Sequence, residues 1–332
     1  MNKAPAIRMV GAGIGMLLLI LDSRTALNGA RSAMNLIMNS VMPSLFPFFF
    51  LSILLTSSGE SGSYSVFGSF GALFRIPQSH TYLLIPAFLG GYPTGAQAVG
   101  MAWKQGSLSK ETAEKMLGYC SNAGPSFLFG ILGSFFPDHR LCWALWVLHI
   151  LGAMFAAQLI PVGFIDPDSS RTKIIRKSLP DVLMSAVKVT ATVCGWVFLF
   201  RIAITFLDKW FFWLIPPSSN VLLCGLLELT NGCCMLYQIP DIRLRFLICS
   251  VMLSFGGFCV LLQTRSVTDG LSLRWYLTGK TIQAAFCGVV SASILYRTVL
   301  PLLIGLPLGI FILFLRKKEV AFHAHLLYNS SK

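Results

Sequence analysis

The feature that most limits this chain is a succession of long apolar blocks joined by short polar segments. Blocks of about 20 apolar residues can cross the hydrocarbon core of a bilayer, which is ~30 Å thick. Only 12% of the 332 residues are charged, against about 25% in soluble domains. The pattern predicts an all-α, polytopic membrane protein whose main surroundings are lipid. The blocks cover about residues 7–21, 43–58, 81–102, 116–136, 141–162, 181–207, 220–239, 246–264, 276–297 and 299–315.

The net charge of +13 could indicate nucleic-acid binding in a soluble protein. Here the basic residues form short clusters between the apolar blocks, as the positive-inside rule expects. They predict topology signals and lipid contacts, and no nucleic-acid partner. The nine cysteines lie mostly inside apolar blocks, without a CxxC pair or histidines at zinc spacing. We therefore expect packing roles for them, and neither a metal nor a cofactor.

Two topologies are compatible with ten blocks. If all ten cross the membrane, the cluster of Lys104, Lys110 and Lys115 faces outward. If the third and seventh blocks enter and return on one side, this cluster, the 171–177 cluster, Arg265 with Arg274, and the basic tail all become cytoplasmic. The second topology follows the positive-inside rule better, although it leaves Lys209, Arg243 and Arg245 outside. It predicts eight spans, two re-entrant elements and a multi-pass protein of the cell membrane with both termini in the cytoplasm.

The third and seventh blocks contain residues that interrupt helices. The third carries Gly90, Gly91, Pro93 and Gly95 close together, and the seventh carries Glu228 within apolar sequence. Proline removes a backbone donor, and glycine is a poor helix former. Broken backbone at membrane depth persists only against protein or a water-filled cavity. The residues predicted to break helices are Gly91, Pro93, Gly95, Gly124, Pro125, Gly232, Gly256 and Gly257.

Three segments of the first half match segments of the second in the same order. Residues 46–51 match 195–200, residues 91–96 match 228–233, and residues 122–127 match 254–259. In the favoured topology the halves run in opposite directions, which predicts an inverted repeat of the kind found in secondary transporters. The predicted parts are an N-terminal helix (1–24), a first repeat (25–165), a basic loop (166–180), a second repeat (181–298) and a last helix with a basic tail (299–332).

The elements at 43–50 (Pro-Ser-Leu-Phe-Pro-Phe-Phe-Phe), 90–96 (Gly-Gly-Tyr-Pro-Thr-Gly-Ala) and 120–127 (Cys-Ser-Asn-Ala-Gly-Pro-Ser-Phe) resemble those of the Gate-domain, or nucleoside-recognition, membrane proteins. The resemblance covers about residues 25–315 and is greatest to the members that act in spore formation. It implies a cell-membrane protein of spore-forming bacteria, related to nucleoside and ferrous-iron transporters. The second half lacks the Tyr-Pro pair, so nucleoside-binding residues cannot be transferred.

Glu228 is the main candidate for binding a solute or a coupling cation, because ionisable groups at mid-membrane usually face a cavity or a partner. Its alternative role is a hydrogen bond to neighbouring backbone. The other candidates offer hydrogen-bonding groups or an aromatic ring beside the breaks, and local capping or packing is the alternative for each. These residues are Tyr92, Thr94, Gln97, Asn122, Ser126, Thr230 and Asn231.

Three basic residues also lie in apolar surroundings. Arg201 and Lys280 are candidates to pair with Glu228 or with an anionic solute, whereas Lys188 is expected to snorkel toward a helix end. An intramembrane serine hydrolase with Ser126 as nucleophile and His149 as base is a further alternative, which would need a hydrogen bond between them. The favoured prediction is not an enzyme.

The favoured function is transport, or gated permeation, of a small polar solute by alternating access, with a nucleoside-like solute and a task in spore formation implied by the resemblance. The alternative is a non-transporting membrane assembly factor for sporulation. The prediction allows a homo-oligomer or a sporulation membrane partner. A wet cavity around Thr94, Asn122 and Glu228 would favour transport, whereas a tightly filled midplane would favour the assembly factor.

Overall fold

The computed structural model describes residues 4–58, 68–76, 78–161 and 177–299, and within these ranges its regular elements are all helices. Helices long and apolar enough to cross a membrane cover Ser23–Leu55, His139–Leu159, Leu179–Trp210 and Ile242–Val267. The predicted helical membrane fold is confirmed. Most of the tenth block, the basic tail and the loop 162–176 lie outside the described residues.

The chain begins with a helix, α1, followed by a long span, Ser23–Leu55. Helix α1 (Ala4–Leu21) packs against α2 (Ser23–Leu36), whose start is capped by the Asp22 carboxylate accepting from the backbone N–H of Thr25 at 3.3 Å. A π-helical turn, η1 (Ile37–Val41), joins α2 to α3 (Met42–Ser58) without a break. The apolar pattern predicted only the part from residue 43 onward, because the polar side chains of α2 lower its hydropathy. Helix α4 (Gly68–Leu73) follows.

A re-entrant hairpin and a broken helix complete the first half. The hairpin enters through η3 (Gln78–Leu83) and η4 (Pro86–Gly90), turns at residues 91–93 and leaves through α5 (Thr94–Lys104). The broken helix consists of α6 (Lys110–Met116), a non-helical stretch and α7 (Pro125–Gly130), followed by η5 (Leu132–Phe135). Helix α8 (His139–Leu159) then crosses the molecule.

The second half presents the same order of elements. These are the long helix α9 (Leu179–Trp210) with η7 (Phe212–Leu214), a hairpin of α10 (Pro217–Leu227) and α11 (Leu229–Cys234) ending in η8 (Leu236–Gln238), a broken helix of α12 (Ile242–Phe255) and α13 (Gly257–Val267), and α14 (Arg274–Leu295).

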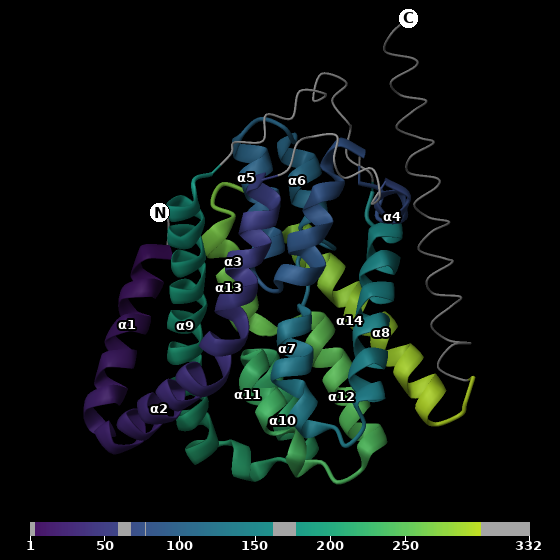
Figure 1. Cartoon of the computed structure of the whole chain (residues 1–332). Helices are drawn as coiled ribbons and strands as arrows, with labels where there is room; N and C mark the ends of the chain where they lie inside the picture. Colours follow the sequence, from purple (N-terminus) through teal and green to yellow (C-terminus); the bar gives the residue numbers. More distant parts are fainter. Residues whose placement is uncertain (1–3, 59–67, 77, 162–176, 300–332) are drawn as a thin grey trace, which may run out of the picture.

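The two halves have opposite orientations (Figure 1). The hairpin containing α5 lies at the upper end of the molecule, and the hairpin of α10 and α11 lies at the lower end. The chain rises through α2 and α3 but descends through α9. The three pairs of matched segments fall at equivalent places: on α3 and α9, at the two hairpin turns, and at the two broken helices.

Several of the predicted topology signals gather at the upper end. Lys104 ends α5 and Lys110 begins α6, while Arg265 lies in the last turn of α13 and Arg274 begins α14. A hydrogen bond of 2.9 Å from the Ser272 backbone N–H to Glu114 Oε1 joins these two regions.

At the lower end, two of the basic residues that fit the topology least well have local partners. Lys209 forms an ion pair with Asp22. Arg245 donates to the carbonyl oxygens of Phe135 and Ile239 at 2.7–3.0 Å. These side chains therefore have structural contacts that an isolated topology signal would not need.

Candidate functional site

The four helix interruptions meet at the centre of the molecule. A Cβ added to Gly124 would lie 2.9 Å from the backbone nitrogen of Gly91, so the first hairpin turn and the first broken helix touch through backbone. In the second half, a Cβ added to Gly257 would lie 2.8 Å from the carbonyl oxygen of Gly225. The Tyr92 hydroxyl donates to the carbonyl oxygen of Leu253 at 3.2 Å and links the halves.

The glycines serve two different purposes. Gly91, Gly256 and Gly257 have φ values of +80°, +82° and +83°, a conformation that favours glycine. Gly95 and Gly232, by contrast, lie inside α5 and α11 and do not break them, contrary to the prediction. A side chain at Gly95 would collide with the carbonyl of Cys120, and one at Gly232 would collide with the backbone of Gly225. Their role is close packing of the hairpin arms.

Of the remaining predicted break residues, Pro93 precedes α5, Gly124 precedes α7 and Pro125 is the first residue of α7. Proline is well suited to the first position of a helix because the N–H it lacks would have no partner there.

Glu228 caps a helix deep inside the protein. It is 1% exposed, and it separates α10 from α11. Its carboxylate accepts from the backbone N–H of Thr230 at 3.1 Å, the backbone N–H of Asn231 at 2.7 Å and the Asn231 side-chain amide at 2.6 Å. The backbone bonds are those of an N-cap, so the structural alternative considered for this residue is present in the fold.

A small cavity of about 30 Å³ lies beside this cap. Glu228, Thr230 and Tyr92 contribute to its wall, together with Gly91, Gly124 and Gln263. A cavity of this volume can hold water, which needs about 10–15 Å³ of such space. The junction is therefore nearly filled in this conformation, and a nucleoside-sized solute does not fit without movement of the hairpins.

Lys280 of α14 is a fully buried lysine at the same junction. Its ammonium donates to Gln283 Oε1 at 2.8 Å, Asn122 Oδ1 at 3.1 Å and the Tyr92 hydroxyl at 3.4 Å, and it lies 5.2 Å from the centre of the Tyr92 ring. These partners are all neutral. Burying a cation without an anionic partner is costly, and such a residue in a membrane protein commonly marks a solute pathway.

His149 and Gln283 extend this polar cluster. His149 Nε2 accepts from the backbone N–H of Ala123 at 3.1 Å, and the Gln283 side-chain amide donates to the carbonyl oxygen of His149 at 2.9 Å. Ser254 Oγ lies 3.4 Å from His149 Nδ1. Ser126 Oγ is buried and has no hydrogen-bond partner among the described residues. The hydrogen bond that a Ser126–His149 hydrolase would need is therefore not formed.

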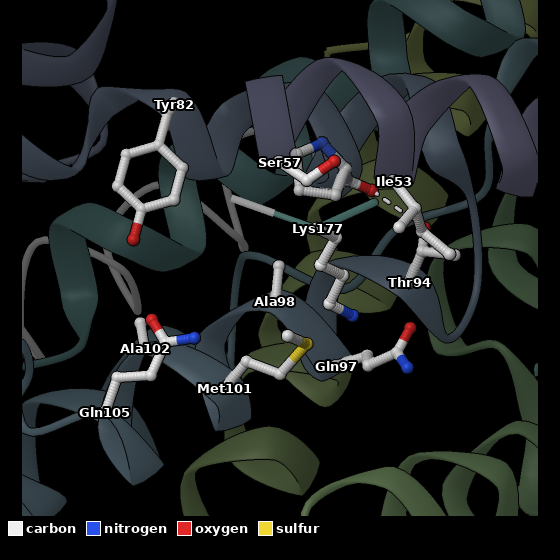
Figure 2. Close-up of a pocket in the computed structure, with 11 residues that line it drawn as sticks. Ile53, Ser57, Tyr82, Thr94, Gln97, Ala98, Met101, Ala102, Gln105 and Lys177 are labelled. Atoms are coloured by element: carbon white, nitrogen blue, oxygen red, sulfur yellow. Dashed lines mark hydrogen bonds between the residues drawn. The ribbon is translucent and has the colours of Figure 1, made fainter. Parts of the chain in front are cut away.

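Thr94 and Gln97 face a second pocket, of about 60 Å³, toward the upper end. Figure 2 shows the Lys177 ammonium and the Gln97 amide turned toward the same space, beside Met101. Lys177 donates to Ser185 Oγ at 3.0 Å, and burial lowers the pKa of its ammonium from the usual value. Lys177 precedes α9, so this pocket lies between α3, α5 and the start of the second half.

A third pocket, of about 220 Å³, lies toward the lower end between α9 and the second hairpin. Arg201 contributes to its wall and donates from Nε to Ser32 Oγ at 2.9 Å and from Nη1 to Asn231 Oδ1 at 2.7 Å. Arg201 therefore reaches Glu228 only through Asn231. Neither of the pairings with Glu228 considered for Arg201 and Lys280 is a direct one.

Six of the eight predicted solute-binding residues fall into three groups. Glu228, Thr230 and Tyr92 share the central cavity, Thr94 and Gln97 share the upper pocket, and Asn122 belongs to the Lys280 cluster. Of the other two, Asn231 joins Glu228 to Arg201, and Ser126 is buried without a hydrogen-bond partner among the described residues. Gln283 and Ser254 were not predicted as site residues. The polar positions of α14, Lys280 and Gln283 three residues apart, were the available signal, since residues at that spacing share a helix face.

Comparison with known proteins agrees with the membrane fold. The chain is similar to the sporulation integral membrane protein YlbJ of Bacillus subtilis (strain 168), with 23% identity over 296 residues that cover 75% of this chain and 72% of that protein. No family model matches the chain, and neither does any solved structure. The similarity supports a relation to that protein, while the wider Gate-domain resemblance stays a prediction.

Proposed function

We propose that this protein is a membrane transporter of a small polar solute and that it acts during spore formation. The observation that carries the proposal is the meeting of four helix interruptions, two from each of two oppositely oriented halves, beside a buried lysine. Inverted repeats with discontinuous helices are the architecture in which transporters place solute and ion sites near the midplane. The similarity to a sporulation membrane protein supports the biological setting.

The charge of the junction favours a solute with an anionic or electron-rich oxygen group. Lys280 is satisfied by three neutral oxygen atoms, whereas the Glu228 carboxylate already accepts three hydrogen bonds. A solute oxygen could replace one neutral partner of the ammonium with a charge-assisted bond, which is stronger. The upper and lower pockets each carry a further basic side chain, Lys177 and Arg201. These two pockets lie toward opposite ends of the molecule, where the two openings of a transport pathway are expected.

The test is solute uptake into liposomes that contain the purified full-length protein. The panel comprises nucleosides, small carboxylates and amino acids, each with and without a proton gradient. We expect saturable uptake of at least one class, and loss of that uptake in Lys280→Met. Absence of uptake for every solute, by protein that restores spore formation in cells, would overturn the proposal.

The small central cavity favours a second candidate, a membrane assembly factor that does not transport. Comparing solute uptake with spore formation in cells that carry a variant distinguishes the two candidates. If Lys280→Met abolishes uptake but leaves spore formation intact, assembly is the activity that sporulation needs. If Lys280→Met loses both uptake and spore formation while the protein stays in the membrane, transport is the activity that sporulation needs.

A further inference from the structure

The lower pocket has two side chains of opposite charge and no bond between them. Arg201, Thr205 and Asp208 of α9 line one side, and Cys224, Tyr237 and Gln238 of the second hairpin line the other. Among the described residues, Arg201 donates to Ser32 and Asn231 and forms no ion pair with Asp208. The pocket, at about 220 Å³, is far larger than the central cavity.

The two charges lie at different depths. Arg201 and Asp208 are seven residues apart on α9, which places them on one face of the helix about 10.5 Å apart along its axis. Asp208 is exposed and lies two residues before the end of α9, whereas Arg201 is half-buried and contacts the hairpin. The pocket therefore has a negative mouth and a positive base.

The Arg201 guanidinium keeps donors for a ligand. Its bonds to Ser32 and Asn231 use Nε and Nη1, so the hydrogens of Nη2 remain available among the five that the group carries. A planar guanidinium is the side chain best matched to a carboxylate. Asp208, an acceptor when ionised, suits an ammonium group. Thr205, whose hydroxyl hydrogen is donated to the Arg201 carbonyl at 2.8 Å, offers further acceptor capacity.

We propose that the lower pocket binds a small zwitterion of the amino-acid class, with its carboxylate on Arg201 and its ammonium on Asp208. Both side chains line the same pocket of about 220 Å³, and the charge-assisted hydrogen bonds that they would form with the ligand are about 2.8 Å long. A simple anion would meet the repulsion of Asp208, and a simple cation that of Arg201. The inference deepens the proposed function, because it names the solute class at one mouth of the pathway.

The experiment is calorimetric titration of the full-length protein in lipid nanodiscs with three probes. L-alanine carries both charges, propionate carries only the carboxylate, and ethylamine carries only the ammonium. We expect saturable binding of alanine and at least tenfold weaker binding of the other two. Alanine that binds no more tightly than propionate and ethylamine would overturn the proposal.

Variants assign the two charges. Arg201→Gln should weaken alanine binding at least tenfold, and Asp208→Asn should weaken alanine binding while strengthening propionate binding. A residue that only maintains structure would not produce that opposite pair of changes. Arg243→Gln, at an exposed arginine on α12, is the matched control and should bind alanine like the wild type.

Because Arg201 contacts two other elements, Asp208→Asn at the exposed mouth keeps the test valid if Arg201→Gln fails to fold. Unchanged alanine and propionate affinities in Asp208→Asn would contradict the assignment. Binding in nanodiscs does not require transport. Alanine binding without uptake of any solute would therefore refute the proposed transport alone, and uptake without alanine binding would refute the zwitterion site alone.

Discussion

The two re-entrant hairpins occupy equivalent places in the two halves but are built from different chemistry. Applying the spacing of the matched segments, 228 − 91 = 137, Gly91 corresponds to Glu228 and Thr94 to Asn231. For α3 and α9 the spacing is 195 − 46 = 149, so Ser52 corresponds to Arg201. The first hairpin turns on a glycine with φ of +80°. The second turns on a buried carboxylate that caps the next helix.

This difference shows that an inverted fold does not require equal chemistry at its two ends. In the first half, Thr94 Oγ1 donates to the carbonyl oxygens of Gly91 and Pro86 at 2.8 and 3.2 Å, within its own hairpin. In the second half, Asn231 joins Glu228 to Arg201 on a neighbouring helix. Asn231 therefore fastens the second hairpin to α9 through charged groups, whereas the hydrogen bonds of Thr94 stay within the first hairpin.

The largest expected effect tests what the hairpins have in common. Gly95→Ala and Gly232→Ala should each destabilise the protein by about 3 kcal/mol or more, at the upper end of the cost of overpacking, because the new methyl group meets backbone that cannot rotate away. Thermal unfolding in detergent measures the loss. Gly13→Ala in α1, where no atom lies within 4 Å, is the control and should be neutral. If only one of the two variants is destabilised, close packing against backbone is not a feature that the two hairpins have in common.

The second prediction concerns the junction that both halves build. Lys280→Met should reduce solute uptake at least tenfold and change stability little, because removal of a charge that is costly to bury offsets the loss of a donor by three buried acceptors. Lys188→Met, at an exposed position of α9, is the control for loss of a lysine in a span. A large fall in the melting temperature of Lys280→Met would instead assign Lys280 to the architecture.

Much of this architecture was predictable from local composition. Glycine and proline at 90–95, and a carboxylate in the seventh block, indicated where helices would fail, and the basic clusters indicated that the halves are inverted. The α2 segment was missed because polar residues such as Arg24, Asn28 and Arg31 interrupt its apolar pattern, although it continues into α3 as one span.

The site was harder to predict than the fold, because its contacts join distant parts of the chain. Lys280 and Asn122 are 158 residues apart, and Tyr92 and Leu253 are 161 residues apart. Composition flagged Lys280 as a cation in apolar surroundings but did not indicate that its partners are neutral. Likewise, Glu228 was recognisable as an acid in a dry position, whereas its backbone partners depend on the start of α11.

The third prediction concerns the residue at which each hairpin turns, Glu228 in the second half and Gly91 in the first. Glu228→Ala should cost about 2 kcal/mol, near the upper limit for loss of an N-cap, because three buried donors lose their acceptor. Glu228→Gln keeps one acceptor oxygen and should cost less. Gly91→Ala, the matched change in the first hairpin, should cost about 1–3 kcal/mol, because its φ of +80° with ψ of 178° is a backbone conformation almost restricted to glycine. If Glu228→Ala is as stable as the wild type but does not transport, the carboxylate binds solute and does not act as a cap.

The smallest expected effect compares Asn231 of the second hairpin, which bonds to a neighbouring helix, with Thr94 of the first hairpin, which does not. Asn231→Ala removes the link between Arg201 and Glu228 and should cost about 1 kcal/mol, the typical net value of a hydrogen bond. Thr94→Val removes the equivalent polar group of the first hairpin at a similar cost. Only Asn231→Ala should loosen the contact between α9 and the second hairpin.

The reactivity of Cys224, which is buried and lines the lower pocket, measures this loosening. Mass spectrometry should find faster maleimide labelling of Cys224 in Asn231→Ala than in Thr94→Val, with Cys142 on α8 as the internal reference. Equal labelling rates in the two variants would mean that the charged link does not hold the hairpin, and the contrast between the two halves would then be one of composition alone.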